Sequence, residues 1–161
     1  MDYLWTPWRY QYVSDPAKDD ACIFCVAVAL GDDAKSLIVL RAKKNFVILN
    51  RFPYTTGHVM IVPFTHTADF SGCDRETVSE MMHLAQRVQA ALAAAYKPEG
   101  YNLGMNLGRC AGAGVTGHLH LHLLPRWTGD TNFMTTTAET RMHPEELAVT
   151  FDKLRRALAG S

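Results

Sequence analysis

The sequence lacks the features that mark several large classes of protein. No apolar run approaches the length of a membrane span, and there is no internal repeat or low-complexity tract. Sixteen Lys and Arg residues balance sixteen Asp and Glu residues, so no bulk positive charge argues for a nucleic-acid partner. The N-terminal MDYLWTPWRY lacks the apolar stretch of a signal peptide. We therefore expect a single domain over residues 1–161, cytoplasmic, acting on neither nucleic acid nor membranes.

Cysteine is scarce, with four in the chain. A reducing compartment disfavours structural disulfides. Cys22 and Cys25 form the CxxC pair CIFC, which suits two thiolates on one tetrahedral zinc ion, although a redox pair has the same spacing. We expect Cys73 and Cys110 to be ordinary small buried residues.

Histidine is also uncommon, but GHLHLHLLPRW (117–127) holds three of the seven histidines within five positions. The alternation predicts a half-buried strand, with leucines toward a core and His118, His120 and His122 on the other face. Strand positions two apart are separated by roughly 6.6 Å and those four apart by roughly 13 Å. Since Zn–N bonds are about 2 Å long, two of the three can reach one metal ion but not all three. At least one histidine therefore has another role, unless all three are simply solvated.

The rest of the chain predicts an antiparallel sheet with helices. Two β-rich runs in 36–51 are joined by AKKN as a hairpin, and further strands are expected in 57–64, 101–108 and 118–124. Pro63 and Pro125 are expected to end their strands because proline cannot donate to a ladder. With short connections between strands, we predict an α+β domain: a mainly antiparallel five-stranded sheet with one long helix and a C-terminal helix on one face.

Two helices are predicted from apolar periodicity. The longer covers 74–96, with Asp74 as N-cap and KPEG as its stop. Its apolar stripe comprises Val78, Met81, Met82, Ala85, Val88, Leu92 and Ala95. The second begins near Pro144 and carries Leu147, Phe151, Leu154 and Leu158 on one side.

A glycine-rich loop, GRCAGAGVTG, lies directly before the histidine strand. Glycine allows backbone N–H groups to converge on an anion, so the loop suggests a phosphate beside an imidazole. Histidine can attack phosphorus as a nucleophile or act as an acid or base near neutral pH. Asn50 and His58 lie at neighbouring strand ends, and His66 follows the third strand. For each of these singly, a structural role is as good an interpretation as a functional one.

The sequence resembles the histidine-triad (HIT) superfamily of nucleotide hydrolases and transferases. HLHLHLL satisfies the signature His-φ-His-φ-His-φ-φ, where φ is apolar, and CIFC, NFVILNRFPYTTGHVMIVPFTH, NLG and the glycine loop follow in family order. Within the superfamily, LWTPWR and PRWTGDTNFM resemble the diadenosine-tetraphosphate phosphorylase and hydrolase branch.

This resemblance implies roles for individual residues. His120 matches the nucleophile that attacks the α-phosphorus, His122 the residue that binds the phosphoryl oxygens, and His58 a histidine that supports the site. Asn50 matches a ribose contact, Ile48 and Met60 match the walls of the base pocket, and phosphate would be cradled by Asn106, Gly114 and Thr116. Zinc-containing members pair the CxxC with two histidines, which here implies a structural Zn²⁺ site of Cys22, Cys25, His66 and His118.

Several points stay open from sequence. Many family members carry Gln followed by Ser or Thr before the triad, where this chain has Gly114, Val115, Thr116 and Gly117. The acceptor is therefore undecided between water and phosphate, and Mg²⁺ is a further candidate with a polyphosphate substrate. Alternatives are a nucleoside phosphoramidate hydrolase, a non-catalytic zinc-braced nucleotide-binding module, and a zinc hydrolase with metal on His120 and His122. The resemblance also implies a homodimer, and Trp127 is expected to stack on a second base, unless it is a core residue.

Overall fold

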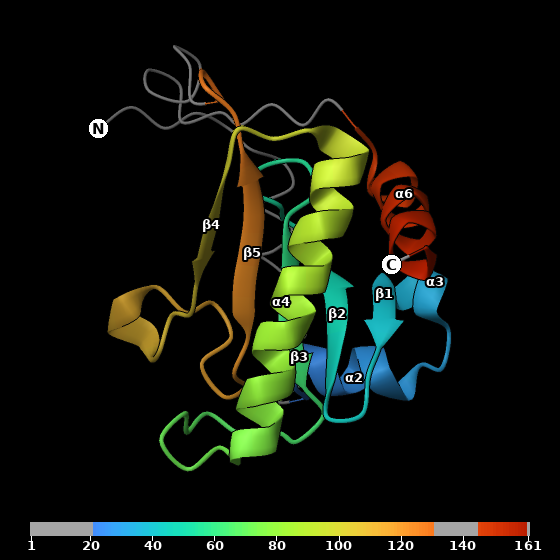
Figure 1. The fold of residues 1–161 in the computed structure, drawn as a ribbon. Helices are drawn as coiled ribbons and strands as arrows, with labels where there is room; N and C mark the ends of the chain where they lie inside the picture. Colours follow the sequence, from blue (N-terminus) through green and yellow to red (C-terminus); the bar gives the residue numbers. More distant parts are fainter. Residues whose placement is uncertain (1–20, 131–144, 161) are drawn as a thin grey trace, which may run out of the picture.

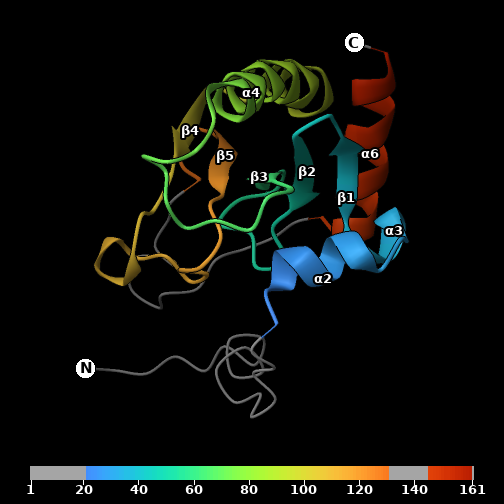
Figure 2. The same cartoon turned by 90° about the horizontal axis from the view of Figure 1, so that it is seen from below.

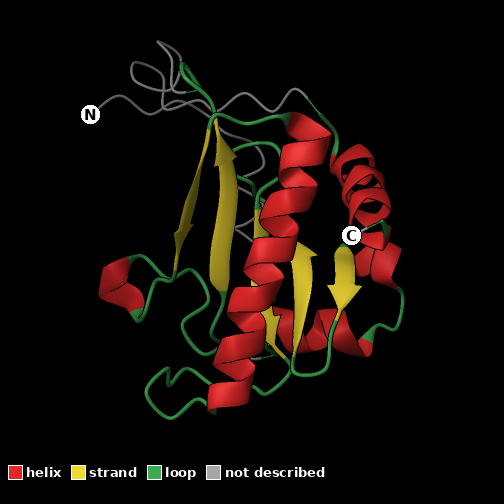
Figure 3. Cartoon of the chain, viewed as in Figure 1, coloured by secondary structure: helices red, strands yellow, loops and turns green. Residues whose placement is uncertain are grey.

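The computed structural model describes residues 21–130 and 145–160 (Figure 1). Within these ranges, strands β1 (Ile38–Arg41), β2 (Asn45–Leu49), β3 (Val59–Pro63), β4 (Gly100–Gly104) and β5 (Leu121–Arg126) form one sheet in the order β1-β2-β3-β5-β4. Each neighbouring pair is antiparallel. The predicted α+β class with a five-stranded antiparallel sheet is confirmed (Figure 3).

The two predicted helices share one face of the sheet, but a helix that was not predicted covers the other face. The long α4 (Arg75–Tyr96) and the C-terminal α6 (Leu147–Ala159) pack on one face, whereas α2 (Ile23–Ala29) lies on the other (Figure 2). A short α3 (Asp33–Ser36) leads from α2 into β1. With only seven residues, α2 is too short to show an apolar period, and only Phe24 among them is buried. No helix in the described ranges is long and apolar enough to cross a membrane.

Two apolar cores result, one on each side of the sheet. The larger lies between the sheet and the two long helices; it includes Val59, Ile61, Leu121, Leu123, Leu92 and Leu154. The smaller lies beneath α2 and consists of Phe24, Ile38, Phe46, Ile48, Met60 and Val62. Because neighbouring residues of a strand point to opposite faces, β2 and β3 each contribute to both cores.

The helix α4 begins and ends as predicted, but its buried stripe is rotated. The Asp74 carboxylate accepts from the backbone N–H of Thr77, and Lys97 follows the helix in the left-handed region with φ 48°. Met82, expected to face the core, is exposed, and Leu84 is buried in its place. A helical period of 3.6 residues aligns Leu84 with Met81 and Val88 and carries Met82 to the side.

The C-terminal helix α6 begins at Leu147, so its predicted start near Pro144 is wrong; Pro144 itself lies outside the described residues. Glu145 ties this end of α6 to α4. Its carboxylate accepts from the Tyr96 hydroxyl at 2.5 Å and forms an ion pair with Lys153. The contact fixes α6 beside the end of α4 (Figure 1).

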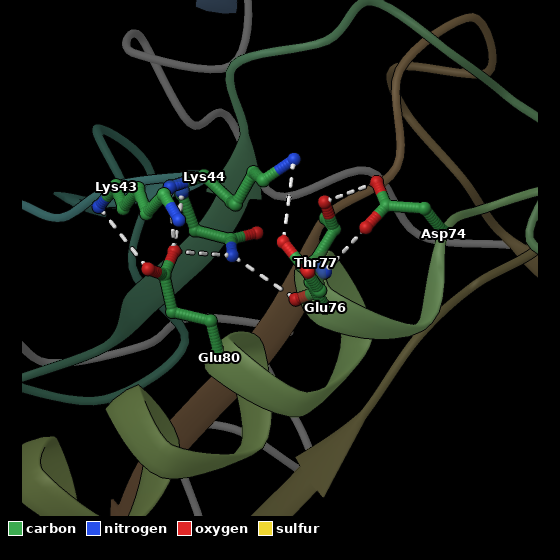
Figure 4. Close-up of polar contacts among 7 residues, drawn as sticks. Lys43, Lys44, Asp74, Glu76, Thr77 and Glu80 are labelled. Atoms are coloured by element: carbon green, nitrogen blue, oxygen red, sulfur yellow. Dashed lines mark hydrogen bonds and ion pairs between the residues drawn. The ribbon is translucent and has the colours of Figure 1, made fainter.

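Glu80 of α4 holds the turn of the β1–β2 hairpin (Figure 4). Its carboxylate accepts from the backbone N–H groups of Lys43, Lys44 and Asn45 at 3.1, 2.8 and 2.8 Å. It also accepts from the buried side-chain amide of Asn45 at 2.8 Å. Burial raises the pKa of Glu80, but the hydrogen bonds from Asn45, Lys44 and Lys43 lower it by more. The net pKa therefore lies below its ordinary value of 4.5.

Glu80→Gln is expected to lower the free energy of unfolding at neutral pH by about 1–2 kcal/mol, since charge-assisted hydrogen bonds are lost. A carboxylate with a lowered folded-state pKa stabilises the protein above its ordinary pKa of 4.5 and loses this effect as the pH falls through the lowered value. The variant should therefore show a shallower loss of stability below that pH in urea unfolding. Glu76→Gln is the control, because the Glu76 side chain is 75% exposed and lies 3.8 Å from Lys44 Nζ. Equal losses in both variants would contradict the role of Glu80.

Position 57, directly before His58, requires glycine for two reasons: its backbone conformation and the close packing around it. Its φ is +83°, and an added Cβ would lie 2.9 Å from Leu92 Cδ2 and 3.2 Å from Pro125 Cγ. Gly57→Ala is therefore expected to lower the free energy of unfolding by about 2–4 kcal/mol. Gly31→Ala separates the two causes, because Gly31 has φ +68° but nothing within 4 Å of an added Cβ. It should cost only about 1 kcal/mol; equal costs would show that the contact with Leu92 is unimportant.

Candidate active site and metal centre

Only one of the three alternating histidines lies within a strand. The strand β5 begins at Leu121, so His118 and His120 precede it and the predicted strand over 118–124 is displaced. The ladder with β3 ends at the Ile61–Leu121 pair. Continuing this register would place Pro63 opposite Leu119, and Pro63 has no N–H to donate to it. Leu119 instead donates its N–H to the carbonyl of Thr67 at 2.7 Å.

The prediction that Pro125 ends the strand is also wrong. β5 continues through Pro125 to Arg126, with Tyr101 opposite Pro125. On its other side, pairing with β3 stops at Leu123, so beyond that point β5 has a single ladder partner. A proline is tolerated where one side of the strand is unpaired.

The triad histidines are buried rather than solvated. His118 and His120 are 2% and 6% exposed, and His122 is half-buried. The Phe24 ring of α2 covers the first two, with ring centroids 5.4 Å from His118 and 5.2 Å from His120. The missed helix therefore removes these histidines from water.

Cys22, Cys25, His66 and His118 form one cluster, in which the four ligand atoms lie within 4.8 Å of one another and can hold a metal ion. Sγ of Cys22 lies 3.2 Å from His118 Nδ1, and Sγ of Cys25 lies 3.4 Å from His66 Nδ1. Ligands of a tetrahedral zinc ion are about 3.3–3.8 Å apart, so the donor set and its spacing fit zinc.

Of the other cysteines, Cys73 is partly buried and Cys110 is exposed, which corrects the expectation that both are buried.

The ring of His118 is oriented for metal binding by a backbone contact. Its Nε2 lies 2.9 Å from the carbonyl oxygen of Pro63, so Nε2 donates the hydrogen and Nδ1 keeps its lone pair toward the cysteines. Burial also lowers the pKa of His118, which favours the neutral ring that a metal needs. Within the described ranges, the group of side chains that can hold a metal ion includes neither His120 nor His122. This argues against the alternative of a zinc hydrolase with its metal on those two histidines.

A relay of hydrogen bonds fixes the proton positions on His58 and His122. The backbone N–H of Tyr54 donates to His58 Nδ1 at 3.1 Å, so the proton of this neutral ring is on Nε2. His58 Nε2 lies 2.9 Å from His122 Nδ1, which must then accept. His122 consequently carries its proton on Nε2 as a donor. His58 is 1% exposed, in keeping with an internal support.

His120 has the opposite arrangement. Its Nδ1 lies 2.9 Å from the backbone carbonyl of His118, so Nδ1 donates and Nε2 carries the lone pair. The rings of His120 and His122 have centroids 4.8 Å apart and are nearly perpendicular. A nucleophilic nitrogen and an N–H donor are thus held side by side, which is an arrangement that can attack a phosphoryl group and bind its oxygens.

Burial keeps both rings neutral. It lowers the pKa of His120, although the hydrogen bond to the His118 carbonyl acts in the other direction. Burial, together with the neighbouring His120, lowers the pKa of His122 to about 4. At neutral pH the lone pair of His120 is therefore available without prior deprotonation.

A pocket of about 210 Å³ opens beside His122. It is lined by Tyr54, Asn102, Leu103, Gly104, Met105, Asn106, His122 and Leu124. Of the predicted ligand-binding residues, Asn106 lies in this pocket, and its amide approaches the Gly112 carbonyl of the glycine loop at 3.5 Å. Gly114 and Thr116 are exposed in the same loop.

The predicted contacts for base and ribose lie next to the triad but outside this pocket. Ile48 pairs with Met60, and Met60 pairs with His122, so the three form a row across one face of the sheet. Ile48 and Met60 are each 7% exposed in the core beneath α2. Asn50 follows β2, where its Oδ1 accepts from the Phe52 N–H at 2.9 Å and its Nδ2 lies 3.4 Å from His58 Nδ1.

Trp127 lies at the far end of the triad strand. It is partly buried, directly after β5, and its N–H donates to Asp130 Oδ2 at 3.1 Å. It is five positions after His122, a distance of roughly 17 Å along an extended chain. Whether it meets a second base stays a prediction.

Sequence reasoning missed three residues of this region. Tyr54 stacks near His58 and His122, with centroid distances of 4.7 and 6.1 Å. Phe24 covers the triad, and Asn102 lines the pocket. An aromatic residue four positions before His58, and one inside the CxxC pair, were available signals; the position of Asn102 depends on the register between β4 and β5.

Comparisons with known proteins agree with this geometry. A family model of the HIT domain matches residues 32–129. The chain is 35% identical to an AP-4-A phosphorylase of Mycobacterium tuberculosis over 99% of this chain and 83% of the relative. It is 33% identical to the adenosine 5′-monophosphoramidase HNT1 of Saccharomyces cerevisiae, over 71% of this chain and 68% of the relative.

Among solved structures, a zinc-bound histidine triad family protein from Mycobacterium smegmatis superposes with a TM-score of 0.71 at 31% identity, covering 88% of this chain and 95% of the other. The family match spans more than half of the chain and contains the whole triad. This chain therefore belongs to the HIT-domain family.

Proposed function

We propose that this protein is an enzyme that cleaves dinucleoside polyphosphates through a covalent nucleotidyl-His120 intermediate. The observation that carries the proposal is the pair of opposite tautomers: His120 with a lone pair on Nε2, and His122 with a proton on Nε2. A binding module has no need of a buried neutral nucleophile beside such a donor. The 35% identity to an AP-4-A phosphorylase supports a diadenosine polyphosphate as substrate.

The first step is attack of His120 Nε2 on the α-phosphorus. A nitrogen–phosphorus bond forms, the bond from that phosphorus to the bridging oxygen breaks, and the remaining nucleoside polyphosphate leaves with the electron pair. His122 donates from Nε2 to a phosphoryl oxygen, where negative charge must be held. His58 keeps His122 in the donating tautomer through the 2.9 Å contact.

The second step transfers the nucleotidyl group to an acceptor. An oxygen of water or of inorganic phosphate attacks the same phosphorus, the bond to His120 breaks, and the lone pair returns to Nε2. The proton of a water acceptor passes to solvent. The open loop around Gly114, with few side chains, has room for a second anion and so favours phosphate as acceptor.

Several further assignments belong to this proposal. Zinc is the metal for Cys22, Cys25, His66 and His118, where it would brace the start of α2 against the triad. Asn50, Ile48 and Met60 would receive the first nucleoside, and Asn106, Gly114 and Thr116 the phosphates. Mg²⁺ would accompany the polyphosphate. We also propose a homodimer.

Product analysis with diadenosine tetraphosphate tests the function. Incubation with and without inorganic phosphate should yield ADP plus ATP by phosphorolysis, or AMP plus ATP by hydrolysis. The second candidate is nucleoside phosphoramidate hydrolysis, favoured by the 33% identity to a monophosphoramidase. Cleavage of adenosine 5′-monophosphoramidate with diadenosine tetraphosphate left intact would replace the first proposal by the second.

Trp127→Ala is expected to raise KM for diadenosine tetraphosphate by roughly tenfold to a hundredfold, because base stacking on an aromatic ring contributes about 1–3 kcal/mol. A mononucleotide ester has no second base, so its KM should change far less. Steady-state kinetics on both substrates make the comparison. Equal losses on the two, with a lowered melting temperature, would identify Trp127 as a core residue.

A further inference from the structure

The pocket beside His122 exists because of the register between β4 and β5. Gly104 lies opposite His122, Asn102 opposite Leu124, and Gly100 opposite Arg126. Residues two apart share a face, so β4 contributes two glycines and a single side chain, that of Asn102, to the face that carries His122. An added Cβ at Gly104 would meet nothing within 4 Å. The space between His122 and Asn102 is thus left open by glycine.

The amide of Asn102 is oriented by Arg126. Arg126 Nη1 donates to Asn102 Oδ1 at 2.6 Å, which fixes the oxygen toward Arg126 and leaves the Nδ2 hydrogens on the other branch of the amide. Arg126 is itself held by Asp130, through Nε at 2.6 Å and Nη2 at 2.8 Å. No protein acceptor for Asn102 Nδ2 occurs within the described ranges. The Nδ2 donor of Asn102 is therefore held at the pocket and is available to a ligand.

The charge of the pocket suits an anion. Among the described residues, its lining contains no carboxylate and offers N–H donors from Asn102, Asn106 and His122. The Arg126 guanidinium adjoins it, and the carboxylate of Asp130 is engaged on the side of Nε and Nη2. Arginine beside amide donors is a common arrangement for binding phosphate groups.

The pocket also has a definite position along the triad segment. His120 comes first, His122 second, and the pocket over Leu124 third, before Arg126. A nucleophile displaces its leaving group in line, so a group expelled by attack from His120 departs on the far side of the phosphorus. The pocket adjoins His122, the residue that would hold the phosphoryl oxygens, on the side away from His120 along the segment.

From this geometry, and resting on the proposed function, we infer that the pocket between His122 and Asn102 binds the leaving polyphosphate, with Asn102 as a donor to it and Arg126 as a positioning residue. Asn102 is then a determinant of specificity for substrates whose leaving group is a polyphosphate rather than a neutral amine.

The experiment compares two substrates that share the nucleotidyl group. Asn102→Asp replaces the amide donor by a carboxylate, whose negative charge repels a polyphosphate. It should lower kcat/KM for diadenosine tetraphosphate by tenfold to a hundredfold, while kcat/KM for adenosine 5′-monophosphoramidate changes less than twofold. Arg126→Gln should produce the same selective loss more weakly. Tyr101→Phe is the matched control on β4, since the Tyr101 hydroxyl bonds to the Gln89 carbonyl of α4 and lies away from the pocket.

The outcomes separate the possible sources of the anion. Equal losses on both substrates would overturn the inference, because the scissile group itself would then be affected. A raised KM for inorganic phosphate with unchanged kcat/KM for diadenosine tetraphosphate would assign the pocket to the acceptor and also overturn it. Wild-type enzyme is measured first: failure to cleave diadenosine tetraphosphate would refute the proposed function, whereas cleavage without selectivity in Asn102→Asp refutes only the pocket.

Discussion

His120→Ala is expected to lower turnover of diadenosine tetraphosphate by at least about a thousandfold, with nucleotide affinity largely retained. The reason is the loss of the attacking atom: covalent catalysis needs the Nε2 lone pair, which the Nδ1 contact to the His118 carbonyl directs away from that carbonyl. The pocket and the His58–His122 contact do not involve this side chain. Rapid-quench kinetics and binding of a nucleotide product measure the two quantities separately.

His83→Ala serves as the control, since His83 is an exposed histidine on α4 and should leave turnover unchanged. His120→Gly with added imidazole offers a positive test, because a free ring can enter the vacated space and restore part of the rate. Near-wild-type turnover in His120→Ala would remove this residue from the role of nucleophile.

Cys22→Ser is expected to remove the metal and lower the free energy of unfolding by about 3 kcal/mol or more, since metal binding contributes to folding free energy. Wild-type protein prepared without chelators should contain about one zinc ion per chain. Turnover should also fall, because the His118 ring belongs to the group that can hold the metal while its backbone carbonyl accepts from His120 Nδ1. Elemental analysis, thermal unfolding and kinetics measure the three effects.

Cys110→Ser is the matched control, because Cys110 is exposed and lies outside the four-residue cluster. It should retain metal, stability and turnover. Wild-type protein free of zinc, with Cys22→Ser equally stable, would leave the CxxC pair as a redox or residual feature.

Much of the site could be predicted from the sequence because its residues occur in short motifs. Cys22 and Cys25 are three positions apart, and His118, His120 and His122 alternate. The prediction that the CxxC pair meets His66 and His118 is supported by their clustering. The strands and α4 were predictable for a related reason, since each buries one face and so carries a regular apolar period.

Other features depend on contacts between distant segments. The buried state of His120 follows from α2, whose seven residues show no periodic signal. The start of β5 at Leu121 follows from its register with β3, in which Ile61–Leu121 is the last pair.

Composition and motif determined that this chain is an α+β protein with a histidine triad and a candidate set of metal ligands. Only the tertiary structure decided which nitrogen of each histidine holds a proton, because that depends on the backbone groups of Tyr54 and His118 that the fold brings within hydrogen-bonding distance. It also decided that a pocket lies between His122 and Asn102. A pairing register of strands joins residues far apart in the chain, and a shift of one residue would turn Asn102 to the opposite face of the sheet.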